Sequence, residues 1–168
     1  SDNKELEDYY KTSVISGLVA LWESDEFKFE NFPVTSGIDG GAVCLYQWSM
    51  GYNAEFIILN LKDKVFDLLK LLINSGIDKH ICMSVNGVGQ GNFSYSYNLW
   101  SIIYFYYKTL CILQKGFEYY EDIKKFFITE DARLNKFEHL TDYGTQNNML
   151  EMRSLGYEHY VPSPNAER

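Results

Sequence analysis

The residues that could do chemistry in this chain begin with a glycine-rich segment, Gly87-Val88-Gly89-Gln90-Gly91. It follows a short apolar run and precedes a predicted helix, which is where glycines let a backbone approach phosphates in nucleotide-binding turns. The dinucleotide fingerprint reads G-x-G-x-x-G, whereas this segment reads G-x-G-x-G, and no Lys-Ser or Lys-Thr directly follows its last glycine. The pattern favours a connecting loop, and a ligand site near Gly87–Gly91 is the alternative.

Histidines and cysteines could supply metal ligands or a nucleophile. His80 and Cys82 would share one face of a strand, and His139 and His159 each follow a glutamate. Zinc sites and catalytic triads need several such groups to converge, but no Cys-x-x-Cys or His-Glu-x-x-His occurs. We therefore predict no metal, no cofactor and no catalytic residue.

The three cysteines, Cys44, Cys82 and Cys111, are widely spaced and lie among apolar neighbours. This pattern favours buried free thiols in a reducing cytoplasm over a disulfide with one spare thiol. The first residues contain no visible signal peptide, which also favours a cytoplasmic protein.

Carboxylates gather in the first 32 residues, where eight acids and three bases give −5 of the chain's net charge of −8. Such a region attracts basic proteins and speeds their docking. The same acidity argues against nucleic acids and anionic membranes, which recruit proteins through lysine and arginine. The predicted contact residues are Glu23, Asp25, Glu26 and Glu30. Adjacent carboxylates elsewhere, such as Glu130-Asp131, are interpreted as a solvated face.

Aromatic residues provide the second signal for binding. The chain holds 14 tyrosines, too many for all of them to turn inward from their predicted helices. Tyrosine gives a large contact area at low entropic cost and is enriched at the centres of protein interfaces. We predict that Tyr95 and Tyr97, on one predicted helix, join the acidic residues in contacting a partner, although a tyrosine-rich core is the alternative.

A small, acidic, tyrosine-rich domain without a catalytic motif is similar in kind to bacterial immunity proteins. The resemblance is one of composition, and it implies a non-enzymatic inhibitor that neutralises a basic partner, such as a nuclease toxin domain. Two other classes stay open. One is a small enzyme or ligand-binding domain at Gly87–Gly91, and the other is a structural or assembly subunit.

The length of 168 residues and the periodicity of apolar residues predict how these groups are positioned. We predict a mostly α-helical, single compact domain over residues 1–160, with five to seven helices, a possible small β element and a mobile tail at 161–168. A mixed α+β fold is the alternative. No run reaches the ~20 apolar residues of a membrane span. The expected helices cover residues 3–22, 42–50, 52–73, 95–114 and 117–129.

Other segments carry weaker patterns. Residues 23–33 alternate phenylalanine with polar residues and predict an extended piece or hairpin arm, and residues 80–85 predict a strand or an extended connector. Leu134, Phe137 and Leu140 are spaced for a helical turn or two, and Met149, Met152 and Leu155 for another.

Overall fold

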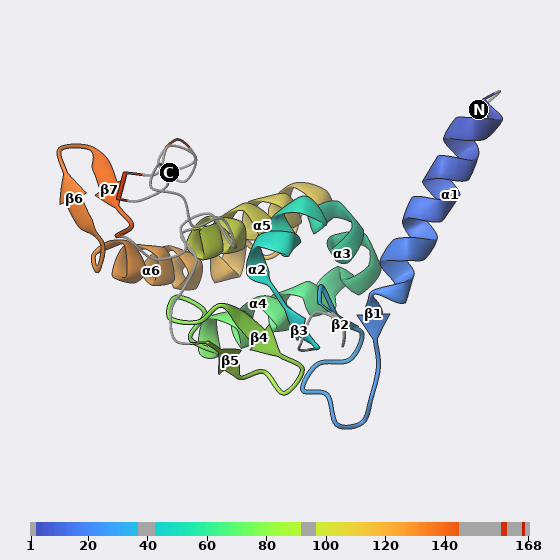
Figure 1. Ribbon diagram of the computed structural model, residues 1–168, viewed down its shortest axis with the longest axis horizontal. Coiled ribbons are helices and arrows are strands. Elements are labelled where there is room, and N and C mark those ends of the chain that lie inside the picture. Colours follow the sequence, from blue (N-terminus) through green and yellow to red (C-terminus); the bar gives the residue numbers. More distant parts are fainter. Residues whose placement is uncertain (1–2, 37–42, 92–96, 145–158, 161–165, 167–168) are drawn as a thin grey trace.

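The computed structural model describes residues 3–36, 43–91, 97–144, 159–160 and 166 (Figure 1). Over these residues the chain is mostly α-helical with short antiparallel strands, as predicted. The helices are α1 (Lys4–Val19), α2 (Gln47–Tyr52), α3 (Ala54–Leu61), α4 (Val65–Asn74), α5 (Tyr97–Leu113) and α6 (Tyr120–Asp131). The strands are β1 (Leu21–Trp22), β2 (Phe32–Pro33), β3 (Cys44–Leu45), β4 (Cys82–Ser84), β5 (Gly89–Gln90), β6 (Asn135–Phe137) and β7 (Leu140–Asp142). The predicted helical turn near Met149 and, apart from residue 166, the predicted tail lie outside the described residues.

The hydrophobic core lies among α2, α3, α4 and α5, the central helices of Figure 1. Helix α4 shows why it forms there, because Val65, Leu68, Leu69 and Leu72 recur at steps of three and four and are all buried. Phe105 of α5 is fully buried in the same core. Each such side chain contributes about 1.5–3 kcal/mol relative to an exposed one.

Three predicted helices are corrected by the structure. The helix expected over residues 3–22 ends at Val19, since Leu21 and Trp22 form strand β1. The helix expected over residues 52–73 is divided into α3 and α4, because Lys62 has a φ of 51° and starts a single 3-10 turn. A left-handed residue with a side chain cannot continue an α-helix. The helix expected over residues 42–50 was also wrong at its start, since Cys44 and Leu45 form a strand and the helix begins at Gln47.

The strands form three small antiparallel sheets. The extended piece or hairpin arm predicted over residues 23–33 is confirmed at its end, where Phe32 and Pro33 form β2 and pair with β1, whereas residues 23–31 form the loop between the two strands. Residues 80–85, predicted as a strand or an extended connector, contain strand β4, which lies between β3 and β5. The helical turns predicted at Leu134, Phe137 and Leu140 were wrong, because a turn with Glu138 at a φ of 55° folds this segment into the β6–β7 hairpin.

Helix α1 begins as predicted and then departs from the expected packing. The Asn3 side chain caps it by accepting a hydrogen bond from the Leu6 amide at 3.2 Å. An amphipathic pattern predicts a face buried on the core, yet no residue of α1 is buried and Tyr9 and Tyr10 are 72% and 68% exposed. Figure 1 shows α1 projecting away from the central helices.

None of the described helices is both long enough and apolar enough to span a bilayer.

Candidate partner-binding site

The four predicted acidic contact residues lie on one loop, which joins β1 to β2. Buried Phe29 and half-buried Phe27 hold the loop against the core, and the ring of Phe27 packs edge-on against Phe32 with 6.2 Å between centroids. The Lys28 amide also donates to the Val85 carbonyl oxygen at 2.9 Å. Because the phenylalanines alternate with polar residues, the carboxylates of this acidic loop are left in solvent. They are Glu23, Asp25, Glu26 and Glu30.

Three of these residues surround a shallow hollow of about 660 Å³, which Glu23, Asp25 and Glu30 line together with Ser24 and Phe27. Glu30 forms an ion pair with Lys64. Within the described part of the chain, no lysine or arginine pairs with the other three acids of the loop. The loop therefore presents uncompensated negative charge on a fixed backbone.

The predicted tyrosines are not brought to this loop by any described contact. Tyr95 lies outside the described residues, and Tyr97 is the first residue of α5 with its side chain undescribed. Farther along α5, Tyr107 is 58% exposed, as the tyrosine argument requires. Tyr106 is instead buried and donates to the Gly116 carbonyl oxygen at 2.8 Å, which matches the alternative of a tyrosine-rich core.

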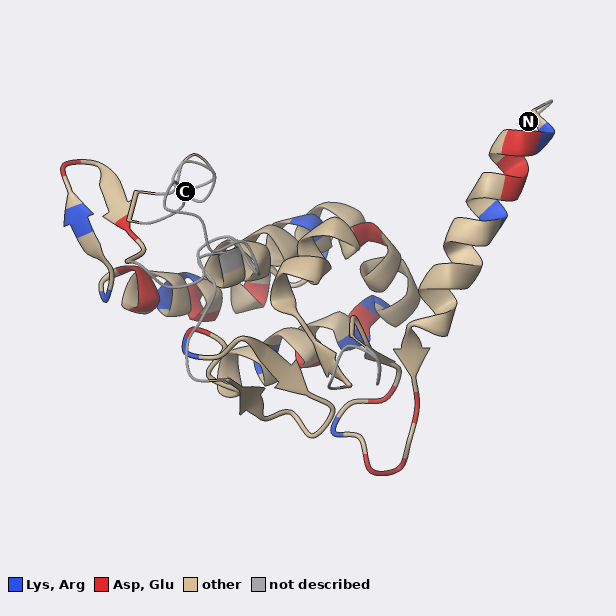
Figure 2. Cartoon of the chain, in the orientation of Figure 1, with Lys and Arg blue, Asp and Glu red and all other residues tan. Residues whose placement is uncertain are grey.

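A second acidic segment lies on α1. Glu5, Glu7 and Asp8 are exposed in its first turns, where Lys4 and Lys11 leave a net charge of −1 over residues 3–11, and Lys11 forms an ion pair with Glu7. Figure 2 shows these acids near the free end of the helix and the acidic loop beyond its other end. The two acidic segments thus lie toward opposite ends of α1.

Between them lies a groove that the sequence reasoning missed. It has a volume of about 460 Å³ and separates α1 from β2, α2 and α3. At its base, Gly17 lets α1 approach α3, because a Cβ there would lie 2.6 Å from the Phe56 ring. The Val34 amide also donates to the Ala20 carbonyl oxygen at 2.7 Å. The small residues at 13, 17 and 20 are a signal of close approach on this face. The groove is lined by Tyr10, Ser13, Val14, Ser16, Gly17, Ala20, Leu21, Pro33, Val34, Thr35, Ser49, Asn53, Phe56 and Ile57.

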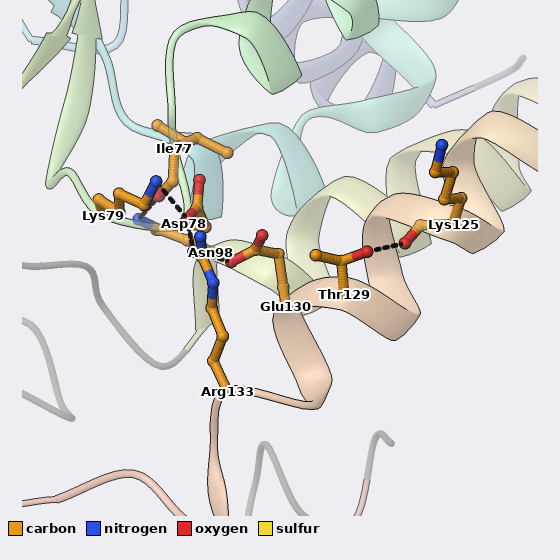
Figure 3. Close-up of polar contacts among 8 residues, drawn as sticks. All are labelled: Ile77, Asp78, Lys79, Asn98, Lys125, Thr129, Glu130 and Arg133. Atoms are coloured by element: carbon orange, nitrogen blue, oxygen red, sulfur yellow. Dashed lines mark hydrogen bonds and ion pairs between the residues drawn. The ribbon is translucent and has the colours of Figure 1, made fainter.

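A carboxylate pair is found elsewhere, between the segment after α4 and the end of α6 (Figure 3). Arg133 donates to Glu130 at 2.7 Å and also bonds Asp78, and both carboxylates are nearly buried. Burial and the neighbouring Asp78 raise the pKa of Glu130. Paired carboxylates can serve acid–base catalysis, but here one guanidinium bridges both of them.

The surroundings of this pair indicate a structural role. The Asn98 side-chain amide of α5 donates to the His80 carbonyl oxygen at 2.9 Å. It also reaches the Ile77 carbonyl oxygen at 3.4 Å (Figure 3). Within α6, the Thr129 hydroxyl donates to the Lys125 carbonyl oxygen at 2.8 Å. We therefore interpret the cluster as a tie between α6 and the turn that leads into β4.

The Gly87–Gly91 segment is a hairpin between β4 and β5. Two of its backbone donors are already engaged, because the Gly87 amide donates to the Ser84 carbonyl oxygen at 2.9 Å and the Val88 amide to the Ser84 hydroxyl oxygen at 3.3 Å. Gly89 packs so closely that a Cβ would lie 2.2 Å from the His80 ring. These glycines fit a tight connection better than a phosphate cradle.

The cysteines follow the prediction in part. Cys44 and Cys82 are buried free thiols, whereas Cys111 is exposed, so the prediction of burial was wrong there. A hydrogen bond from Cys82 lowers the pKa of the Cys44 thiol, and the same contact together with burial raises the pKa of Cys82. Among the residues described, no three cysteine, histidine or acidic side chains are grouped to hold a metal ion.

Comparison with known protein families, curated proteins and solved structures finds no match for this chain. The arguments for its function therefore come from its own surface.

Proposed function

We propose that this protein is a non-enzymatic inhibitor that binds a basic protein and neutralises it, as a bacterial immunity protein blocks a cognate nuclease toxin in the cytoplasm. The observation that carries the proposal is the acidic loop. Its four carboxylates are exposed on a backbone held by buried phenylalanine, and a shallow hollow lies among them. Tyr95 and Tyr97 belong to the proposal as aromatic contacts.

Presentation on a fixed loop supports tight and fast binding. A preordered loop loses little conformational entropy when it is captured, so more of the contact energy contributes to affinity. Uncompensated charge at Glu23, Asp25 and Glu26 also attracts a basic surface before contact, and such steering raises association rates by about 10- to 1,000-fold at low salt. A stoichiometric inhibitor needs both properties.

The test compares two variants that remove the same charge. E23Q/D25N/E26Q neutralises the loop, and E118Q/E121Q/D122N neutralises three exposed acids at the start of α6 and in the turn before it. Each variant and the wild type are immobilised, exposed to lysate of the source cells at low salt, and eluted with rising salt.

We expect a basic protein, in stoichiometric amount, to be retained by the wild type and the α6 variant and lost by the loop variant. Equal retention by both variants would show that the loop is not the contact. Retention of no basic protein by the wild type would overturn the proposed function.

A further inference from the structure

Helix α1 exposes more apolar surface than is usual for a helix of a protein without a binding partner. Its 16 residues include none that is buried, and Leu6, Tyr9 and Tyr10 expose apolar surface near its free end. Most of the stability of a helix in a protein comes from packing of an apolar face on other elements. The closest approach of α1 to the core lies at its end, where Gly17 faces the Phe56 ring and Ala20, the residue that caps the helix, accepts from the Val34 amide. Its exposed face is therefore suited to a partner.

The groove beside α1 has the form of a helix-binding site. Tyr10, Val14 and Gly17 recur along α1 at steps of four and three and line one wall, and Phe56 belongs to the opposite wall. At a rise of about 1.5 Å per residue, the wall from Tyr10 to Ala20, the residue that caps α1, is roughly 15 Å long, which matches nearly three turns of a second helix. Helix-in-groove recognition uses an apolar face with this spacing.

Charge identifies the occupant. None of the 14 residues that line the groove is charged, whereas Glu5, Glu7 and Asp8 lie toward one end and the acidic loop lies beyond the other (Figure 2). The complementary ligand has an apolar centre and basic ends. A second copy of this chain would bring the same two acidic segments and a further net charge of −8.

We infer that the groove between α1 and the α2–α3 segment receives an amphipathic helix of the basic partner, with apolar residues at its centre and lysine or arginine at both ends. This inference rests on the proposed function, because it assigns the docking surface for the same class of partner. The acidic loop then contacts one basic end, and the first turns of α1 contact the other.

The probe is a synthetic amphipathic peptide of roughly five helical turns, with leucines at helical spacing in the centre and lysines at both ends. A twin peptide carries glutamates at the ends. Binding is measured by fluorescence anisotropy with the wild type, V14N and I15N. Val14 lines the groove, whereas Ile15, its β-branched neighbour, does not line it and is 60% exposed, so the second variant is a matched control.

We expect the lysine-ended peptide to bind, V14N to weaken it by at least about tenfold, and I15N to change it by less than about twofold. Equal losses in both variants, or none, would overturn the groove assignment. Because V14N could also unfold α1, the wild type is examined with a nitroxide at the centre of the peptide. Line broadening centred on the amides of residues 10–21, 34–35 and 49–57, which line the groove, supports the assignment, and broadening centred elsewhere overturns it.

Two further outcomes separate this inference from the proposed function. If E23Q/D25N/E26Q abolishes peptide binding and V14N leaves it unchanged, the groove assignment fails while the acidic loop keeps its proposed role. If the glutamate-ended peptide binds as tightly as the lysine-ended one, the inference that the occupant has basic ends is overturned. If sedimentation shows that the wild type is a dimer and V14N is a monomer, the occupant of the groove is a second copy of this chain and the assignment to a partner helix is overturned.

Discussion

The glycine between α5 and α6 offers a quantitative test of the fold. Gly116 has a φ of 91°, and a Cβ built on it would lie 2.1 and 2.2 Å from two ring atoms of Phe66. That ring is buried and stacks on Tyr119 with 4.8 Å between centroids, so it has little room to move. Gly144 has a φ of 73°, and a Cβ there would meet no atom within 4 Å. Both G116A and G144A therefore place an alanine at a positive φ, which costs stability in each variant. Only G116A also creates a clash, between the new Cβ and the Phe66 ring.

The expected magnitudes follow from these two penalties. A left-handed conformation costs a residue with a side chain roughly 1–2 kcal/mol, which is the whole expected loss for G144A. Overpacking a well-filled core adds about 1–3 kcal/mol, so G116A should lose about 2–5 kcal/mol of the free energy of unfolding. Urea denaturation of both variants, analysed with the wild-type slope, measures the difference.

Equal losses in G116A and G144A would refute this reasoning, because they would mean that Phe66 relaxes without cost. A gain in stability at G116A would refute it more directly. It would show that the chain between the two helices does not hold the left-handed conformation.

Two further predictions concern ionisable groups. Since burial and Asp78 raise the pKa of Glu130 above its ordinary value of 4.5, its stabilising contribution is present below that pH and is lost as the pH rises through the folded-state pKa. E130Q should thus gain in urea stability relative to wild type between about pH 4 and about pH 8, and a constant difference would contradict the shift. The native protein should also react rapidly with a thiol reagent at Cys111 alone, while Cys44 and Cys82 react only on unfolding; fast labelling of all three would contradict their burial.

The parts of the fold predicted correctly are those with long, periodic apolar patterns. Helices α5 and α6 follow from such patterns and from Gly116 between them, whose left-handed conformation suits a stop. The break between α3 and α4 falls at Lys62, which has a φ of 51°, and no glycine or proline at that point of the sequence predicts it. Leu134, Phe137 and Leu140 fit a helical spacing over too few residues to exclude the hairpin that forms.

Of the candidate site, the acidic loop could be predicted from the sequence and the groove could not. The acidic contact residues could be predicted because residues close together in the sequence stay close together in any fold. Buried phenylalanines between them leave their carboxylates in solvent. These residues are Glu23, Asp25, Glu26 and Glu30. The groove could not be found, since its walls come from residues about 40 positions apart, such as Val14 and Phe56. A periodic pattern on α1 also says nothing about whether its apolar face is covered by this chain or by another.

The pattern of strand pairing has a consequence for how the chain folds. Of the four strand pairings among described residues, three join neighbouring segments, and only β3 with β4, through Cys44 with Ser84 and Leu45 with Met83, links strands about 40 residues apart. Local contacts close small loops and form early, whereas distant ones must first bear the entropy of closing a large loop. We expect the β3–β4 pairing to form after the helices between them have assembled. Substitutions in β3 should accordingly speed unfolding more than they slow folding.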